Sequence, residues 1–337
     1  MKVLMIGGTG TISMAITKQL AAQGEEVWLL NRGSRNAGLP ENINFIQADM
    51  SREEEVAAKL ECMTFDVVCE FIGFVKEQVE RDFRLFNGKC GQYMYISSAS
   101  AYQKPVGDYK ITESTPLANP YWEYSRNKIT CEEYLMHMYR EHGFPVTIIR
   151  PSHTYDERSM PLGVHGSNGS WQVIKRMLEG KQVILHGDGT TLWTMTHNSD
   201  FAKAFIGLMG NIHAIGDCYQ ITSDESLTWN QIYLAIARAL NVEFKPYYVP
   251  SDFLHAIGPY DFRGGLIGDK ANSVVFDNAK LKRAVPGFTA TVRFDQGAKL
   301  VADYILSHPE CQKDDPEFDA WCDRVIEAME KAKASLM

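Results

Sequence analysis

The N-terminal segment places a glycine-rich turn directly after a short apolar run. Residues 2–6 have the composition of a buried strand, Gly7-Gly8-Thr9-Gly10 follows without a spacer, and a helix-like pattern runs over 12–23. Glycines between a strand and a helix permit a tight turn and let backbone N–H groups approach a phosphate at the positive end of the helix. This order of elements predicts a dinucleotide site on a parallel sheet.

Short apolar runs alternate with helix-like segments through the first 150 residues. The pattern predicts strands over 2–6, 26–30, 43–47, 66–72, 91–96 and 145–149, and helices over 12–23, 52–60, 76–87 and 122–142. Strands that are apolar along their whole length lie in parallel sheets that helices cover on both faces. We therefore expect an α/β fold with a doubly wound parallel sheet.

A change of composition marks the expected border of a second domain. The segment 151–170 is rich in Gly, Ser and Pro, and shorter elements follow it. We expect a dinucleotide-binding domain over 1–155, joined by about 190–215, and a smaller α/β C-terminal substrate lobe over 156–337. Asp315-Pro316 has the composition of a helix start, and apolar residues follow at helical spacing, which predicts a C-terminal helix that packs onto the body.

The end of the second predicted strand bears on the choice between NAD and NADP. An acidic residue about 20 residues after the glycines would bind the adenosine ribose and favour NAD, but the sequence here begins Asn31-Arg32. Arg32 and Arg35 would neutralise a 2′-phosphate, so we expect NADP; NAD remains open if both arginines only face solvent. Asp49, after the third strand, would meet the adenine amine or cap a turn.

Two further motifs supply groups for proton transfer. Tyr124 and Lys128 lie one helical turn apart on the predicted helix 122–142, so a phenol and an ammonium share one face. A nearby positive charge lowers the pKa of a tyrosine and makes it usable as an acid or base near neutrality. Ser97-Ser98-Ala99-Ser100 follows the strand 91–96, at the sheet edge where ligands bind and where a serine hydroxyl would hold a substrate oxygen.

These motifs, in this order, resemble the extended short-chain dehydrogenase/reductase family, which includes the NAD-dependent nucleotide-sugar epimerases and dehydratases. The resemblance is strongest over 1–155 and at Gly187-Asp188-Gly189-Thr190. It implies a Rossmann-type dinucleotide domain and an NAD(P)-dependent epimerase or dehydrogenase acting on a sugar-like hydroxyl or ketone, with a nucleotide sugar as the expected small-molecule substrate. By this resemblance Tyr124 is the general acid or base, Lys128 holds the nicotinamide ribose, and Ser98 binds the reacting oxygen.

The residues expected to contact the two ligands follow from the motifs and from the same resemblance. The expected cofactor residues are Gly7, Gly10, Thr11, Ile12, Asn31, Arg32, Arg35, Asp49, Met50, Phe71, Ile72, Gly73 and Lys128. The expected substrate residues are Ser98, Ser100, His153 and Trp193. The histidines and cysteines do not have the spacing of metal ligands, and we expect no metal site.

Departures from the family pattern bear on the substrate. Ala99-Ser100 stands where the sugar 4,6-dehydratases carry an Asp-Glu pair, which disfavours dehydration. Trp193-Thr194 stands where nucleotide-sugar enzymes carry an arginine that meets the diphosphate, and His153 stands where they carry an asparagine. An indole cannot replace a guanidinium in contact with phosphate, so Trp193 is either a core residue or an aromatic wall for an uncharged or flat substrate.

Two other functions fit parts of the pattern. Trp193-Thr194, Asn31-Arg32-Gly33 and the segment 276–280 also resemble a branch that includes the chloroplast stem-loop-binding proteins, which bind RNA on this fold. A formal net charge of −8 argues against a nucleic-acid partner, because phosphate binding relies on clustered basic residues. A reductase of small carbonyl compounds is the other alternative, and Trp193 would suit it.

The remaining expectations concern compartment and assembly. Seven scattered cysteines without a C-x-x-C pair fit neither a disulfide framework nor a zinc site. No apolar run approaches the roughly 18 residues of a membrane span, and no secretory signal opens the sequence, so we expect a cytoplasmic protein without a membrane partner. By the family resemblance we expect a homodimer formed through the helices 76–87 and 122–142.

Overall fold

A seven-stranded sheet forms the centre of the N-terminal part of the protein. The computed structural model describes residues 1–34, 36 and 38–337, so Arg35 lies outside the described residues. The strands run in the order β12-β7-β5-β4-β1-β2-β3, and every neighbouring pair is parallel. Their bounds are β1 (Lys2–Ile6), β2 (Glu26–Asn31), β3 (Asn44–Gln47), β4 (Phe65–Glu70), β5 (Cys90–Ile96), β7 (Val146–Pro151) and β12 (Asp217–Ile221).

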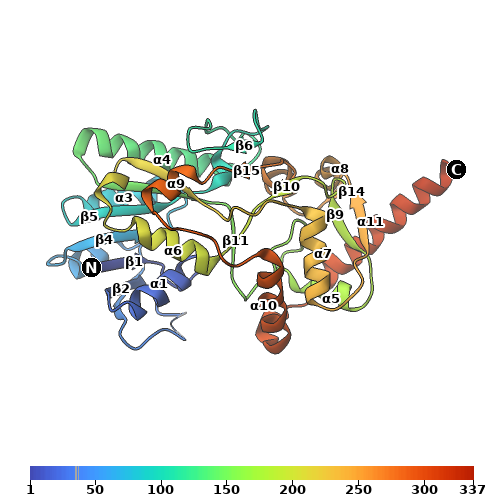
Figure 1. Cartoon of the computed structure of the whole chain (residues 1–337), viewed down its shortest axis with the longest axis horizontal. Helices are drawn as coiled ribbons and strands as arrows, with labels where there is room; N and C mark the ends of the chain where they lie inside the picture. The colour runs from blue at the N-terminus through green and yellow to red at the C-terminus, as the bar shows by residue number, and fades with distance from the viewer. Residues whose placement is uncertain (35, 37) are drawn as a thin grey trace.

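Helices cover both faces of this sheet, as the continuous apolar runs of its strands require. α3 and α4 lie on one side of the strands, and α1 and α6 lie on the other (Figure 1). Alternate residues of β1 are buried in different clusters, since Val3 and Met5 pack with α1 and α6, whereas Leu4 and Ile6 pack with α3 and α4. The helices of this part are α1 (Ser13–Ala22), α2 (Glu53–Lys59), α3 (Lys76–Phe86), α4 (Glu123–His142), α6 (Asn198–Leu208) and α9 (Ala279–Ala284).

The expected elements of the first 150 residues are present, with ends within two residues of those predicted. The doubly wound sheet is therefore confirmed. Between β1 and β4 the chain order of the strands reverses, and a crevice at the carboxyl ends of the strands is expected at such a point. The sheet also extends further along the chain than expected, because β12, at residues 217–221, pairs with β7.

A smaller α/β lobe follows, with its own hydrophobic core. It contains four two-stranded pairs, namely β8 (His153–Tyr155) with β11 (Met195–His197), β9 (Val183–His186) with β14 (Pro246–Val249), β10 (Leu192–Trp193) with β13 (Leu227–Thr228), and β6 (Lys110–Ile111) with β15 (Val275–Phe276). The helices of this lobe are α5 (Trp171–Leu178), α7 (Trp229–Ala239), α8 (Ser251–Ile257), α10 (Phe294–Ser307) and α11 (Pro316–Ser335). Short helical segments elsewhere and within the lobe are η1 (Ala99–Ala101), η2 (Ile212–Ala214), η3 (Arg263–Lys270) and η4 (Pro309–Cys311).

The C-terminal helix begins as its sequence predicts. The Asp315 side chain accepts a hydrogen bond from the backbone N–H of Phe318, and Pro316 is the first helical residue. Phe318, Trp321 and Val325 are buried in the core of the smaller lobe, while the last turns of α11 extend beyond the body (Figure 1). Among the described residues, no helix is both long enough and apolar enough to cross a bilayer.

Candidate active site

A cleft of about 440 Å³ lies at the carboxyl ends of β1, β2, β3 and β4. Its lining includes Gly7, Gly10, Asn31, Arg32, Asp49, Met50, Phe71 and Ile72, all expected from the sequence as cofactor residues. Asp49 also caps a turn, because its carboxylate accepts from the N–H and the hydroxyl of Ser51. Thr9, Ser13, Phe74 and Gln78 line the cleft as well, and the sequence interpretation did not select them for it.

The glycine turn has the geometry of a phosphate cradle. Gly7 and Gly8 adopt φ values of 104° and 59°, which side-chain-bearing residues rarely adopt. A Cβ at Gly10 would meet only the Ser13 hydroxyl, at 3.5 Å, so the space above Gly10 is open to a ligand. No side chain caps the start of α1, and the first N–H groups of a helix have no intrahelical acceptor. The turn therefore fits the pyrophosphate of a dinucleotide.

Thr11 and Ile12, two expected cofactor residues, are not part of the lining of this cleft. Thr11 lines a separate cavity of about 230 Å³ that also contains His153, and its carbonyl accepts from the Asn198 amide at 3.1 Å. Ile12 packs against the core between α1 and the sheet. Only their backbone N–H groups, at the start of α1, remain for a phosphate.

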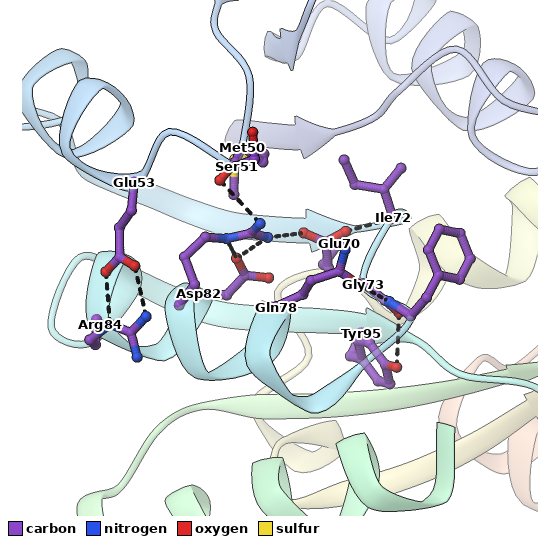
Figure 2. A network of polar contacts seen from close by, with 12 residues as sticks. Met50, Ser51, Glu53, Glu70, Ile72, Gly73, Gln78, Asp82, Arg84 and Tyr95 are labelled. Atoms are coloured by element: carbon purple, nitrogen blue, oxygen red, sulfur yellow. Dashed lines mark hydrogen bonds and ion pairs between the residues drawn. The ribbon is translucent and has the colours of Figure 1, made fainter. Parts of the chain in front are cut away.

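A buried polar network holds the segment after β4 in place (Figure 2). Glu70, fully buried, accepts from the backbone N–H of Ile72. Arg81 lies between two carboxylates, since it donates to Asp82 at 2.7 and 2.9 Å and comes within 3.9 Å of Glu70. Arg81 also donates to the carbonyl of Met50 at 3.1 Å. Two of the segments that line the cleft are thus tied to one buried cation.

The two carboxyl groups of this network share one compensating cation. Burial raises the pKa of Asp82, and the hydrogen bonds that it accepts from Arg81 and from the Tyr93 hydroxyl at 2.7 Å oppose that rise. Burial and the neighbouring Asp82 raise the pKa of Glu70 well above its usual value. Of the two carboxyl groups, Glu70 is therefore the one whose protonated form its surroundings favour more strongly.

Lys128 lies on α4 between the ends of β4 and β5. Its ammonium donates to the carbonyls of Gly73 and Ile96 at 2.6 and 2.7 Å, and the Tyr95 hydroxyl donates to the same Gly73 carbonyl at 3.0 Å. The side chain is buried, and burial lowers its pKa to about 8. Lys128 thus connects the loop of the cofactor cleft to the helix that carries Tyr124.

Tyr124 and Ser98 line a second cavity, of about 260 Å³. The Ser98 hydroxyl contacts the Ser100 hydroxyl at 2.8 Å and accepts from the Ser100 N–H at 3.2 Å, and Ser125 donates to Ser100 at 2.7 Å. Ser98, Ser100, His153 and Trp193, the four expected substrate residues, all line this cavity. The structure therefore brings together the side chains that the sequence placed at the reaction centre.

The expected pKa shift of Tyr124 has the wrong sign. Burial raises the pKa of the phenol, the Ser98 hydroxyl opposes the rise, and Asp269 adds to it. The ammonium of Lys128 lies 5.8 Å from the centroid of the Tyr124 ring and donates to two carbonyls, so it does not offset the desolvation. Without a ligand, Tyr124 is a neutral phenol at neutral pH, ready to donate a proton.

His153 and Trp193 form one wall of the cavity. The Trp193 indole N–H donates to Nδ1 of His153 at 3.3 Å, and burial lowers the pKa of His153 to about 3. The neutral imidazole consequently carries its proton on Nε2. Trp193 is 4% exposed and stacks on Trp229 at 5.8 Å, so it is a core residue that also presents a ligand-facing edge.

The sequence interpretation missed several polar and aromatic side chains of this cavity. Lys104, Trp122, Asp269 and Lys270 line it. Lys104 follows η1, and Asp269 and Lys270 end η3. Lys104, Asp269 and Lys270 come from segments without a recognisable motif or periodicity, and Trp122 opens the predicted helix 122–142 without a sequence signal for a ligand, so only the folded chain shows that they meet.

Comparison with known proteins establishes the family. The family model described as "NAD dependent epimerase/dehydratase family" matches residues 3–221. The chain belongs to this family. It is an NAD-dependent oxidoreductase of the epimerase/dehydratase type, as the resemblance of its motifs implied, and the matched range ends at the last residue of β12.

The proteins that this chain resembles carry names that indicate different functions. A 2'-dehydrokanamycin reductase from Streptomyces kanamyceticus is 23% identical over 75% of this chain and 70% of that protein. The chloroplast stem-loop binding protein of 41 kDa b from Arabidopsis thaliana is 26% identical over 71% of this chain and 63% of that protein. The solved structure of an epimerase from Methanothermobacter thermautotrophicus has a TM-score of 0.75, with 16% identity and coverage of 91% and 93% of the two chains.

We predict that Gly10→Ala lowers dinucleotide affinity by about tenfold or more, equivalent to ~1.4 kcal/mol. The added methyl group would occupy the space in which backbone N–H groups approach the pyrophosphate. Its nearest neighbour in the protein is Ser13 Oγ at 3.5 Å, so the free energy of unfolding should stay nearly unchanged. Fluorescence titration with NADPH and urea unfolding measure the two effects.

Gly8→Ala is the matched control for Gly10→Ala. Its Cβ would lie 2.5 Å from Leu29 Cδ2 at a φ of 59°, so this variant should lose stability, by roughly 1–2 kcal/mol for the backbone conformation alone. A Gly10→Ala protein that binds NADPH as tightly as the wild type would show that the turn does not hold the cofactor.

We predict that Glu70→Gln stabilises the protein as the pH rises. The pKa of Glu70 is raised in the folded protein, whereas the unfolded chain releases this proton near the usual pKa of about 4.3. Each pKa unit between the two states lowers the free energy of unfolding by ~1.4 kcal/mol once the pH exceeds the folded-state pKa. Glutamine keeps the acceptor for the Ile72 N–H and has no proton to lose. Between about pH 4.5 and about pH 8, the free energy of unfolding of the variant should increase by ~1 kcal/mol or more relative to that of the wild type, as measured by urea unfolding. If the two free energies change in parallel with pH, the raised pKa of Glu70 is contradicted.

Proposed function

We propose that the protein transfers hydride at a carbinol or carbonyl carbon of a sugar-like substrate, with Ser98, Tyr124 and Lys128 as its catalytic residues. The observation that carries this proposal is the position of Tyr124 and Ser98 in one cavity, with Lys128 joining that cavity to the dinucleotide cleft. A nucleotide sugar is the substrate class named for several relatives and structural neighbours. A free sugar derivative is the class that the name of the kanamycin-related reductase indicates.

The residues of the cavity divide the chemistry between them. In the reducing direction, Tyr124 gives its phenolic proton to the carbonyl oxygen of the substrate, while Ser98 holds that oxygen by a hydrogen bond. In the oxidising direction, Tyr124 accepts the hydroxyl proton as the C–H bond of the same carbon breaks. A bound nicotinamide supplies the hydride or accepts it. Release of the ketone gives a dehydrogenase, and return of hydride to its other face gives an epimerase.

With its pKa raised by burial, Tyr124 is a neutral phenol at neutral pH. Without a ligand it is therefore in the protonation state that the reducing direction requires. Hydrogen bonds from Ser125 to Ser100 and between Ser100 and Ser98 position the Ser98 hydroxyl in the cavity.

We predict that Tyr124→Phe lowers turnover by about 10²-fold or more, the usual contribution of a general acid or base. Dinucleotide affinity should change by less than about threefold, because Lys128 keeps its two carbonyl acceptors. The assay follows NADPH absorbance with a panel of UDP-sugars and free keto-sugars. Tyr109→Phe, at a 63% exposed tyrosine, is the control and should keep full turnover. Wild-type turnover by Tyr124→Phe would refute the proposal.

We also propose that the protein prefers NADP. Asn31 ends β2, where an acidic residue would select NAD, and the exposed Arg32 lines the cleft beside it. The Asn31 carboxamide accepts from the Gly33 N–H at 2.7 Å, so the loop that presents Arg32 is held by a local hydrogen bond.

We predict that Arg32→Ala weakens NADPH binding by roughly tenfold and leaves NADH binding within about twofold. A hydrogen bond to a charged group is worth ~1.5–3 kcal/mol, and NADH has no 2′-phosphate with which to form it. Titration of both cofactors at low and high salt measures the difference, which should shrink as salt screens the exposed arginine. Equal losses for the two cofactors would contradict the assignment.

A further inference from the structure

The substrate cavity contains a buried lysine whose ammonium has no partner among the described residues. Lys104 lines the cavity and is only 4% exposed. Within the described residues, no hydrogen bond or ion pair engages its Nζ, whereas the other buried lysine and arginine side chains, those of Arg81, Lys128, Arg150 and Arg176, donate to carboxylates or carbonyls. A buried charge without a partner is destabilising. Such a group points to a ligand that completes its hydrogen bonds.

A carboxyl group faces the same space. Asp269 lines the cavity, and within the described part of the chain its side chain accepts no hydrogen bond and forms no ion pair, not even with Lys104. Burial raises the pKa of Asp269, and Lys270 and Lys104 oppose the rise. Burial lowers the pKa of Lys104, and Asp269 opposes that change. The charge of each group therefore shifts the pKa of the other, although no hydrogen bond or ion pair joins them.

Backbone hydrogen bonds fix both groups relative to the reaction centre. The Lys104 N–H donates to the carbonyl of Ala118 at 2.7 Å. The buried Asn119 amide donates to the carbonyls of Ser100 and Gly268, at 2.8 and 2.7 Å. Asp269 therefore follows a residue that is bonded, through Asn119, to the serine segment of the site.

The rest of the lining suits a ring that carries hydroxyl groups. Trp122 and Trp193 provide aromatic surface, and the hydroxyls of Ser98 and Tyr124 provide the reacting end. Among the residues that the structure describes, no arginine lines the cavity, so these residues do not offer the bidentate contact usual for a phosphate. An ammonium offers only donors, and a carboxylate offers only acceptors; together they match hydroxyl groups, which donate and accept.

We propose that Lys104 and Asp269 form the specificity pair of the substrate cavity, in which the ammonium donates to, and the carboxylate accepts from, hydroxyl groups of a sugar ring whose reacting carbon lies at Tyr124. This inference rests on the proposed function and adds the substrate class and its recognition. The ring belongs either to a free glycoside or to the sugar of a nucleotide sugar.

Binding of four probes to the NADP⁺-loaded protein tests the proposal. UDP-glucose and UDP-glucuronic acid represent the nucleotide-linked ring, and methyl glucoside and kanamycin A represent the free glycoside. We expect at least one probe to bind in isothermal titration, and Lys104→Met and Asp269→Asn each to raise its Kd at least tenfold. For a probe that is turned over, KM should rise in both variants, while kcat of Lys104→Met changes by less than threefold. Lys331→Met and Asp303→Asn, at exposed positions, are the matched controls and should bind as the wild type does.

A thermal unfolding measurement separates this role from a structural one. Lys104→Met removes an unpaired buried charge, so its Tm should equal or exceed that of the wild type while ligand affinity falls. Wild-type probe affinity in both variants, no binding of any probe to the wild type, or a lower Tm for Lys104→Met would each overturn the proposal. Unchanged probe affinity in both variants, together with lost turnover in Tyr124→Phe, would overturn only the specificity pair. Unchanged turnover in Tyr124→Phe would instead refute the proposed function.

Discussion

The buried ammonium of Lys128 is the interaction on which the geometry of the site depends. It donates hydrogen bonds to two backbone carbonyls, one after β4 and one at the end of β5, and so connects both to the N-terminal part of α4. A desolvated charge at this depth needs its acceptors, because loss of either would leave it uncompensated. The position of α4 over the sheet edge is thereby fixed, and with it the place of Tyr124, one helical turn earlier. The reaction centre is thus built from backbone carbonyls as much as from side chains.

The two ligand spaces are held by different means. On the cofactor side, Arg81 and its two carboxyl neighbours tie the segments of Met50 and Ile72 from behind the sheet edge. On the substrate side, loops, η3 and the start of α4 contribute to the walls, and among the described residues the charged groups of Lys104 and Asp269 have no hydrogen-bond partner. The polar groups that support the cofactor cleft are therefore paired within the protein before a ligand binds. In the substrate cavity, Lys104 and Asp269 would gain their hydrogen-bond partners from the ligand. This difference suits a family in which one cofactor serves many substrates.

The sequence predicted the parts of this protein that obey local rules. The continuous apolar strands, the glycine turn with Gly7 and Gly10, and the spacing of Tyr124 and Lys128 follow from periodicity and backbone conformation, and the structure shows them in place. The pKa shift of Tyr124 was predicted with the wrong sign, because spacing places Lys128 near the phenol but does not reveal that its ammonium donates to carbonyls. Lys104 and Asp269 are 165 residues apart, and no local pattern relates them.

The amide of Asn119 has a mechanical consequence. Its two N–H groups donate hydrogen bonds to the carbonyl of Ser100, two residues after Ser98, and to the carbonyl of Gly268 in η3 of the smaller lobe. A displacement of η3 toward a substrate would pull on the serine segment through a linkage only one side chain long. The serine segment that would hold the reacting oxygen and the segment that carries Asp269 are thus positioned as one unit.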